Sequence, residues 1–239
     1  MKKPNSKHRK GFTLVELLVV IAIIVALAAL ATPQIFKALK RAAMAEAINN
    51  VKQVKLALDS FAMDFDGQYP NKDTSKRLTG SEEEITDANT AYRQLFFSGD
   101  TQSEKIFWVK GSSIATSSPD DKITDGSGTI SENEILKPGD CHWAYVSEQS
   151  NVSNPSRPLV LDSFKSGEDN FDPTLWDNKA VVLRIDSSAR AERLGVTGEA
   201  KNKVLDSAGE NIFSTQSAAW VGSGLQPSQL LEQPLKRSN

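Results

Sequence analysis

The chain is poor in the residues that most often carry chemistry or covalent cross-links. Its 239 residues include a single cysteine, Cys141, so no internal disulfide can form. The two histidines, His8 and His142, belong to no recognisable Ser/His/Asp or Cys/His pattern, and general acid–base catalysis is not indicated. Cys141 beside His142 could form a nucleophile or half of a metal site. Because no second ligand pair accompanies them, we interpret Cys141 as a partly buried side chain at the start of a strand.

Positive charge is also scarce over most of the chain. Five of the 28 basic residues and none of the 30 acidic residues lie in the first ten positions, which gives this basic leader a charge of +5. The remainder carries −7, and no basic run follows Arg41. This balance does not favour binding to nucleic acid, whose phosphates require a cationic surface.

A long apolar run follows the leader. Phe12–Ala31 contains 20 residues, of which only Thr13 and Glu16 are polar. As a helix it would be about 30 Å long, which is the thickness of a hydrocarbon core. Because the basic residues precede this run, the amino end should stay cytoplasmic and the chain after Ala31 should face outward.

An ordinary secretory signal peptide is the first alternative. It would have a shorter apolar core and a cleavage site of small residues, which Ala26–Ala31 could supply. Such a core does not normally carry a carboxylate near its start, because Glu16 would cost about 2.5–3.5 kcal/mol at the bilayer centre. A charge retained at this position indicates a function and requires a partner, unless the carboxylate simply reaches the membrane interface.

The junction of leader and apolar run resembles a known motif. Residues 10–21, with the sequence KGFTLVELLVVI, resemble the prepilin cleavage and methylation motif of type IV pilins and type II secretion pseudopilins. The resemblance implies that a membrane prepilin peptidase cuts after Gly11 and methylates the new amino terminus of Phe12. It also implies that Glu16 of one subunit pairs with the Phe12 amine of its neighbour, because two charges that are costly alone in an apolar core stabilise each other and fix the axial register.

The helical pattern continues beyond the apolar run. Pro33 should kink or locally melt the helix. Apolar residues then recur at three- and four-residue steps and form one stripe of an amphipathic helix: Ile48, Val51, Val54, Leu58, Phe61, Ala62 and Phe65. Asp66-Gly67 should end it. The segment Asp59–Pro70 resembles the helix-end region of major pseudopilins, which, with the absence of two carboxy-terminal cysteines, favours the secretion branch of the family.

The rest of the chain predicts a small head with an α+β fold. We expect a short helix at Ala88–Phe97, a strand at Ile106–Val109 and an irregular 71–140 region. Further strands are predicted at 142–146, 159–162, 180–185 and 191–194, the last two joined as an antiparallel hairpin. The fold class is thus a long amino-terminal helix, first transmembrane and then amphipathic, with an antiparallel sheet laid across it, as in pilin-like proteins. The expected segments are the leader 1–11, the anchor or filament-core helix 12–32, the amphipathic helix 33–66, a variable loop-rich region 67–140, the sheet 141–195 and a polar tail 196–239.

One internal segment resembles the latter part of an EF-hand loop. Asp125, Ser127, the Thr129 carbonyl and Glu134 fall at oxygen-ligand positions, and a glycine stands at the turn position. The first ligand position, however, holds Ile123 in place of an aspartate. These residues are therefore candidate Ca²⁺ ligands, and a solvated turn before a helix start is the alternative. No other cofactor is expected.

These features predict a structural filament subunit and not an enzyme. Its partners would be further copies, other pilin-like subunits, the prepilin peptidase, membrane lipid and a secretion or pilus assembly platform. It would be stored in a bacterial inner membrane with its head in the periplasm, and would later stand in a periplasmic or surface filament. Type II secretion is our first assignment. The alternatives are a type IV pilus subunit for adhesion or motility, and a membrane-anchored periplasmic binding module.

Overall fold

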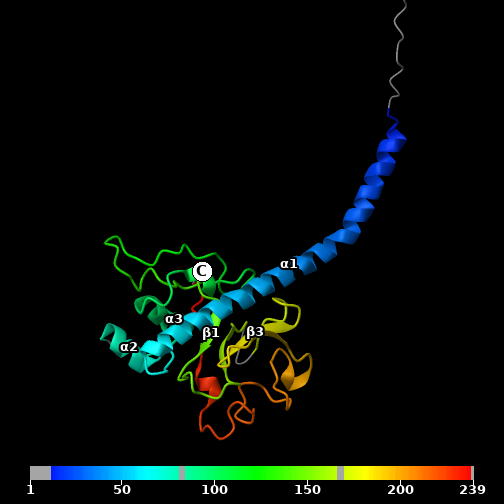
Figure 1. The fold of residues 1–239 in the computed structure, drawn as a ribbon. Coiled ribbons are helices and arrows are strands. Elements are labelled where there is room, and N and C mark those ends of the chain that lie inside the picture. Colours follow the sequence, from blue (N-terminus) through cyan, green and yellow to red (C-terminus); the bar gives the residue numbers. More distant parts are fainter. Residues whose placement is uncertain (1–11, 81–83, 166–169, 238–239) are drawn as a thin grey trace, which may run out of the picture. The chain divides into compact units, whose positions relative to one another are not determined.

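The computed structural model describes residues 12–80, 84–165 and 170–237, which form two compact units, residues 1–41 and 42–239. One helix, α1 (Leu14–Asp64), contributes to both units and confirms the predicted long amino-terminal element (Figure 1). It remains helical through Pro33, so the predicted local melting does not occur. Proline removes only the one backbone donor that would bond the Ala29 carbonyl, and good helix formers flank the site. The Thr32 hydroxyl donates to a different carbonyl, that of Ala28, at 2.7 Å.

The end of α1 lies where the sequence places it. Gly67 has a φ of +81°, and its N–H donates to the Ala62 carbonyl at 2.8 Å, as expected for a left-handed cap. A Cβ at this position would also approach Asn151 Oδ1 to 2.6 Å, so both conformation and space favour glycine. The buried Tyr69 hydroxyl then donates to Asp59 at 3.0 Å, and this bond ties the turn back to the helix.

Two α-helices and one 3₁₀ helix lie between α1 and the first strand. α3 (Ala88–Phe97) forms as predicted, with Asp87 as its cap. α2 (Lys72–Thr79) was not predicted, although Asn71 and Thr74 form a reciprocal capping box at its start. The predicted strand at 106–109 is wrong: a 3₁₀ helix, η1 (Glu104–Phe107), occupies this place because Ser103 caps a turn there. Two further 3₁₀ turns, η2 (Gly198–Ala200) and η3 (Pro227–Gln229), lie between the fourth and fifth strands of the sheet.

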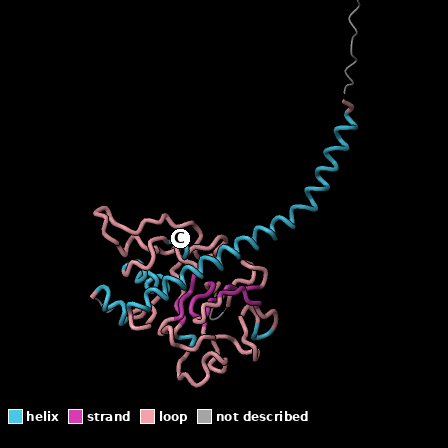
Figure 2. The backbone as a smooth tube through the Cα atoms, in the orientation of Figure 1, coloured by secondary structure: helices cyan, strands magenta, loops and turns pink. Residues whose placement is uncertain are grey.

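The described residues contain one five-stranded antiparallel sheet in the order β4-β3-β2-β1-β5. Its strands are β1 (Trp143–Val146), β2 (Pro158–Asp162), β3 (Lys179–Arg184), β4 (Ala189–Arg193) and β5 (Leu231–Glu232). The first four fall within about two residues of their predicted positions, and β3 and β4 form the predicted hairpin. The carboxy-terminal β5, which pairs with β1, was not predicted. The strands form a small core surrounded by loops (Figure 2).

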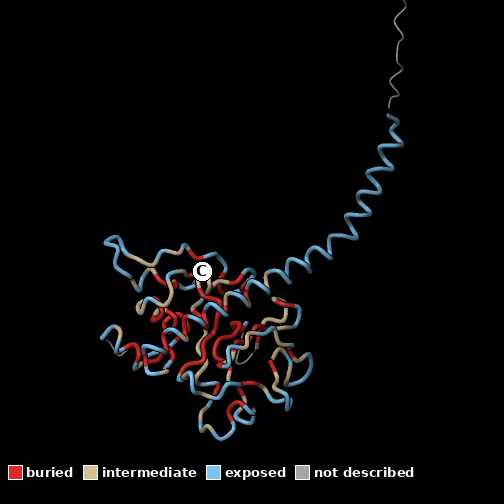
Figure 3. The backbone as a smooth tube through the Cα atoms, viewed as in Figure 1, coloured by how far each residue is buried: buried red, intermediate tan, exposed pale blue. Residues whose placement is uncertain are grey.

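The central strands β1, β2 and β3 are buried on both faces of the sheet, whereas the edge strands β4 and β5 are partly exposed. Trp143, Tyr145, Val181 and Leu183 point into one apolar cluster with the α1 stripe, in which Val51, Val54, Leu58 and Phe61 have no exposed surface. The alternate side chains, such as Ala144 and Val182, point to the other face, where the 204–220 segment supplies Val204, Phe213 and Trp220. Buried backbone is concentrated around the strands in Figure 3. The 196–239 segment, which the sequence predicts as a polar tail, therefore covers the second face of the sheet and also contributes β5.

Candidate functional site

The first unit presents an apolar surface along its whole described length. Every large hydrophobic residue between Phe12 and Leu39 is exposed, and the lowest exposure among them is 45%. By length and composition α1 is able to cross a membrane. A single chain offers no partner that could bury these side chains, so this surface requires lipid or other protein.

The start of α1 is capped by the two polar residues of the apolar run. Glu16 Oε2 accepts hydrogen bonds from the Thr13 backbone N–H at 2.9 Å and from the Thr13 hydroxyl at 2.7 Å. The Glu16 N–H lies 3.2 Å from the Thr13 hydroxyl oxygen, which completes a capping box of the Thr-x-x-Glu type. The cap satisfies backbone donors that would otherwise be unpaired in an apolar environment.

The cap also places the carboxylate near the predicted processing site. Phe12, which directly precedes Thr13, is 75% exposed. Gly11, the residue before the predicted cut, lies outside the described residues. The Glu16 carboxylate is thus held at the end of the helix where cleavage would create a positive amine.

The candidate calcium ligands have other partners in the structure. Asp125 Oδ1 accepts the N–H of Ser127 at 2.8 Å and that of Thr129 at 3.1 Å, which closes a tight turn. Glu134 forms ion pairs with Lys122 and Lys137, both at 3.0 Å. Among the described residues no group of three histidine, cysteine or acidic side chains is arranged to hold a metal ion. Calcium binding at this loop stays a prediction from the sequence.

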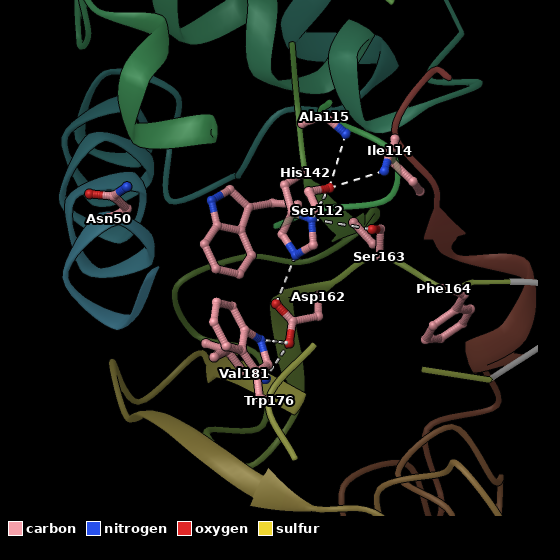
Figure 4. Close-up of polar contacts among 12 residues, drawn as sticks. Asn50, Ser112, Ile114, Ala115, His142, Asp162, Ser163, Phe164, Trp176 and Val181 are labelled. Atoms are coloured by element: carbon pink, nitrogen blue, oxygen red, sulfur yellow. Dashed lines mark hydrogen bonds and ion pairs between the residues drawn. The ribbon is translucent and has the colours of Figure 1, made fainter. Parts of the chain in front are cut away.

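A second cluster lies inside the head and was missed by sequence reasoning. Ser112, His142 and Asp162 come from three separate segments, and all three are buried. His142 Nδ1 lies 2.7 Å from Ser112 Oγ, and His142 Nε2 lies 2.9 Å from Asp162 Oδ1 (Figure 4). The sequence shows no Ser/His/Asp motif, and these three residues come together only in the folded head. No short motif marks the set because intervals of 30 and 20 residues separate its members.

The hydrogen-bond partners define the state of this cluster. Ser112 Oγ accepts the N–H groups of Ile114 at 3.1 Å and Ala115 at 2.9 Å, so its two lone pairs are occupied and its proton points to His142 Nδ1. His142 is therefore the tautomer with the proton on Nε2, and it donates this proton to Asp162. A serine oxygen that already accepts two hydrogen bonds in a buried site is poorly placed for nucleophilic attack.

Asp162 is the centre of the network. Besides His142, it accepts the Trp176 Nε1–H at 2.8 Å and the Val181 N–H at 2.6 Å, both through Oδ2. This hydrogen-bond network thus joins the 112–115 turn, the start of β1, β2, β3 and the 172–178 turns (Figure 4). The network therefore has a structural role, because it fixes a long loop to the sheet.

Cys141 is buried next to this cluster and does not resemble a reactive thiol. Its Sγ–H donates to the Trp143 carbonyl at 3.5 Å, and burial raises the pKa of the thiol well above its usual range. A thiol held in its protonated form is a poor nucleophile and a poor metal ligand. The interpretation of Cys141 as a small side chain at the start of a strand agrees with this environment.

Comparison with known proteins gives one match. A family model described as the prokaryotic N-terminal methylation motif matches residues 6–32, the segment that contains the leader, the Gly11-Phe12 junction and the first part of α1. No curated protein and no solved structure matches the chain significantly. The motif supports a type IV pilin-like subunit, a class of structural proteins that a prepilin peptidase processes. Together with the apolar helix, it is consistent with membrane anchoring.

Proposed function

We propose that this protein is a pseudopilin of a type II secretion system. The exposed apolar helix that begins within the methylation motif is the observation that carries the proposal. Cleavage after Gly11 releases the basic leader, and the new Phe12 amine is methylated. The processed subunit is stored in the inner membrane through α1 and polymerises when this apolar surface leaves lipid for the surface of other subunits.

The Thr13–Glu16 cap supports a specific role for Glu16 in this step. In the single chain the cap uses Oε2 of the carboxylate. A carboxylate has two oxygens and about four acceptor positions, so it can cap its own helix and also bind the Phe12 amine of a neighbour. Opposite charges that meet in an apolar filament core stabilise each other, whereas a one-turn slip would leave both unpaired. Glu16 therefore sets the axial register of the subunits.

The head supports the secretion branch in preference to an adhesive pilus. Cys141 is the only cysteine in the sequence and is buried, so the head lacks the carboxy-terminal disulfide of classical pilins. The Asp59–Pro70 segment, which resembles that of major pseudopilins, forms the tight end of α1. Further copies, other pilin-like subunits and the secretion assembly platform are the proposed partners.

A pair of substitutions separates the two roles of Glu16. Glu16→Gln retains an acceptor for the Thr13 cap but removes the charge, whereas Glu16→Ala removes both. If charge pairing drives assembly, both variants insert into membranes and neither forms filaments, as measured by electron microscopy and by cross-linking of cell-surface or periplasmic fractions. If only the cap matters, Glu16→Gln assembles like the wild type and Glu16→Ala does not. Normal filaments from both variants would contradict any role of Glu16 in assembly.

A further inference from the structure

One carboxyl group in the head lacks the partners that a buried charge requires. Glu104, the first residue of η1, is fully buried. Its Oε1 accepts the Leu136 N–H at 2.5 Å, while Oε2 is buried and has no hydrogen-bond partner among the described residues. An ionised carboxylate with one donor and one unpartnered oxygen is costly in such a site, because water has been removed and little has replaced it.

The charges that face Glu104 add to this cost. Asp140 and Asp120 both lie close enough to repel its negative charge, and Lys137 is the cation that opposes them. The Lys137 ammonium, however, pairs with Asp120 at 3.1 Å and with Glu134 at 3.0 Å, so its charge is not available to Glu104 alone. Repulsion by these partly or largely exposed carboxylates favours the protonated form of Glu104, which is buried.

The position of Glu104 makes its charge structurally important. Its side chain holds Leu136 in the 131–140 segment, and its own N–H donates to Asp121 Oδ1 at 2.7 Å. Asp121 in turn pairs with Lys105 at 3.0 Å. Glu104 thus joins η1 to two separate parts of the long 110–140 segment, which contains no regular helix or strand in the structure.

We propose that Glu104 is a proton-operated lock that fastens the 110–140 segment to the core of the head. The protonated carboxyl is neutral, and its carbonyl oxygen still accepts the Leu136 N–H. Loss of the proton places a charge in a site from which water is excluded. The Leu136 N–H favours this charge, but the carboxylate regains its hydration only when the segment opens, so the segment loosens. Ordering of the segment thereby depends on the pH around the head, whether or not the subunit is in a filament.

The direction of the pH effect follows from the folded state. Burial, with repulsion from Asp140 and Asp120, raises the pKa of Glu104 to about 7, against the opposing effects of the Leu136 N–H and Lys137. The folded head therefore binds more protons than the unfolded chain between the ordinary glutamate pKa and pH 7, and its stability falls as pH rises through this window. From pH 5 to pH 8 we expect the unfolding constant to rise by about tenfold to a hundredfold on account of this residue.

Unfolding of the full chain in detergent, measured at pH 5 and pH 8, tests the lock. Glu104→Gln stays neutral at both values and keeps an acceptor for Leu136, so its unfolding constant should lose this part of the pH dependence. Glu232→Gln is the matched control, because Glu232 is a half-buried carboxyl whose pKa burial also raises, outside the Glu104 cluster. Equal pH dependence of Glu104→Gln and the wild type would overturn the proposal.

Amide hydrogen exchange of the wild type gives a second test that does not depend on a variant. After correction for the intrinsic effect of pH, protection of the Leu136 amide should fall between pH 5 and pH 8. The Gly195 amide, which donates to the Lys203 carbonyl at 2.9 Å, serves as the reference and should keep its protection. A parallel change at both amides, or no change at Leu136, would contradict a local lock.

Discussion

At the scale of single residues, the amino-terminal site and the interior of the head differ in how far the sequence could predict them. Gly11, Phe12 and Glu16 lie in one short motif, so a contiguous pattern identified them as candidates. Ser112, His142 and Asp162 meet only after folding, and single residues of these types are common in any chain. Glu104 was missed for a related reason, since its sequence context is that of an ordinary surface glutamate.

Among the residues of the buried Ser112–His142–Asp162 network, Asp162 should be the one whose substitution lowers stability most. Asp162→Asn keeps the size of the side chain but turns one acceptor oxygen into an NH₂ group, so at least one of the donors from His142, Trp176 and Val181 loses its partner. An unpaired buried group costs about 1–3 kcal/mol, and more where the lost partner was charged. We expect the free energy of unfolding in a denaturant titration to fall by about 2–4 kcal/mol.

Ser163→Ala is the control for this substitution. The Ser163 hydroxyl lies 3.5 Å from His142 Nδ1, at the limit of a hydrogen bond, and the stronger Ser112 bond is already made at that atom. Its loss should change stability by less than about 1 kcal/mol. If the two variants unfold alike, Asp162 does not organise the network.

At the scale of elements, prediction succeeded where a long periodic pattern repeats a simple rule. The α1 stripe spans several turns, and the strands β1 to β3 each present a short apolar run with β-branched or aromatic residues. The prediction failed at 106–109, where the apolar residues suggested a strand but the Ser103 cap formed η1. It also missed α2, whose residues are polar and whose helical start depends on the capping box of Asn71 and Thr74.

The amphipathic part of α1 offers a matched pair of leucines. Leu58 is fully buried in the stripe, whereas Leu56, two residues away on the same helix, is 69% exposed. Leu58→Ala removes packed side-chain atoms and leaves a cavity, so it should reduce the free energy of unfolding by about 2–5 kcal/mol. Leu56→Ala should change it by no more than about 0.5 kcal/mol.

Denaturant unfolding of both variants in the same detergent makes this comparison. Both substitutions change helix propensity equally, so the difference between them reports packing alone. A similar loss for both leucines would mean that the α1 stripe does not pack on the sheet as described.

At the scale of the whole molecule, the sequence predicted a long helix packed on a sheet, but not which segment covers the second face of that sheet. A long helix against one face of an antiparallel sheet followed from periodicity and from the family resemblance. The carboxy-terminal segment was harder, because its apolar residues, Val204, Phe213 and Trp220, are scattered among polar ones and show no period. Its role in covering the second face and supplying β5 depends on long-range contacts that local patterns do not encode.

The two units of the chain differ in what they need in order to bury their apolar side chains. The described part of residues 42–239 contains the buried apolar core, while the large apolar residues from Phe12 to Leu39 remain exposed. The head is therefore complete in itself, and the first unit needs lipid or other subunits. The proposed function of the protein depends on what buries that first unit, and above all on how its amino terminus is processed.

Mass spectrometry of the mature amino terminus is the most direct test of this central claim. The protein should be isolated from cells that contain a prepilin peptidase, and its amino-terminal peptide should be sequenced. We predict a chain that begins at Phe12 with a methyl group on its α-amino nitrogen and retains all of α1. A mature chain that begins near Thr32, without the apolar helix, would identify an ordinary signal peptide and contradict the account.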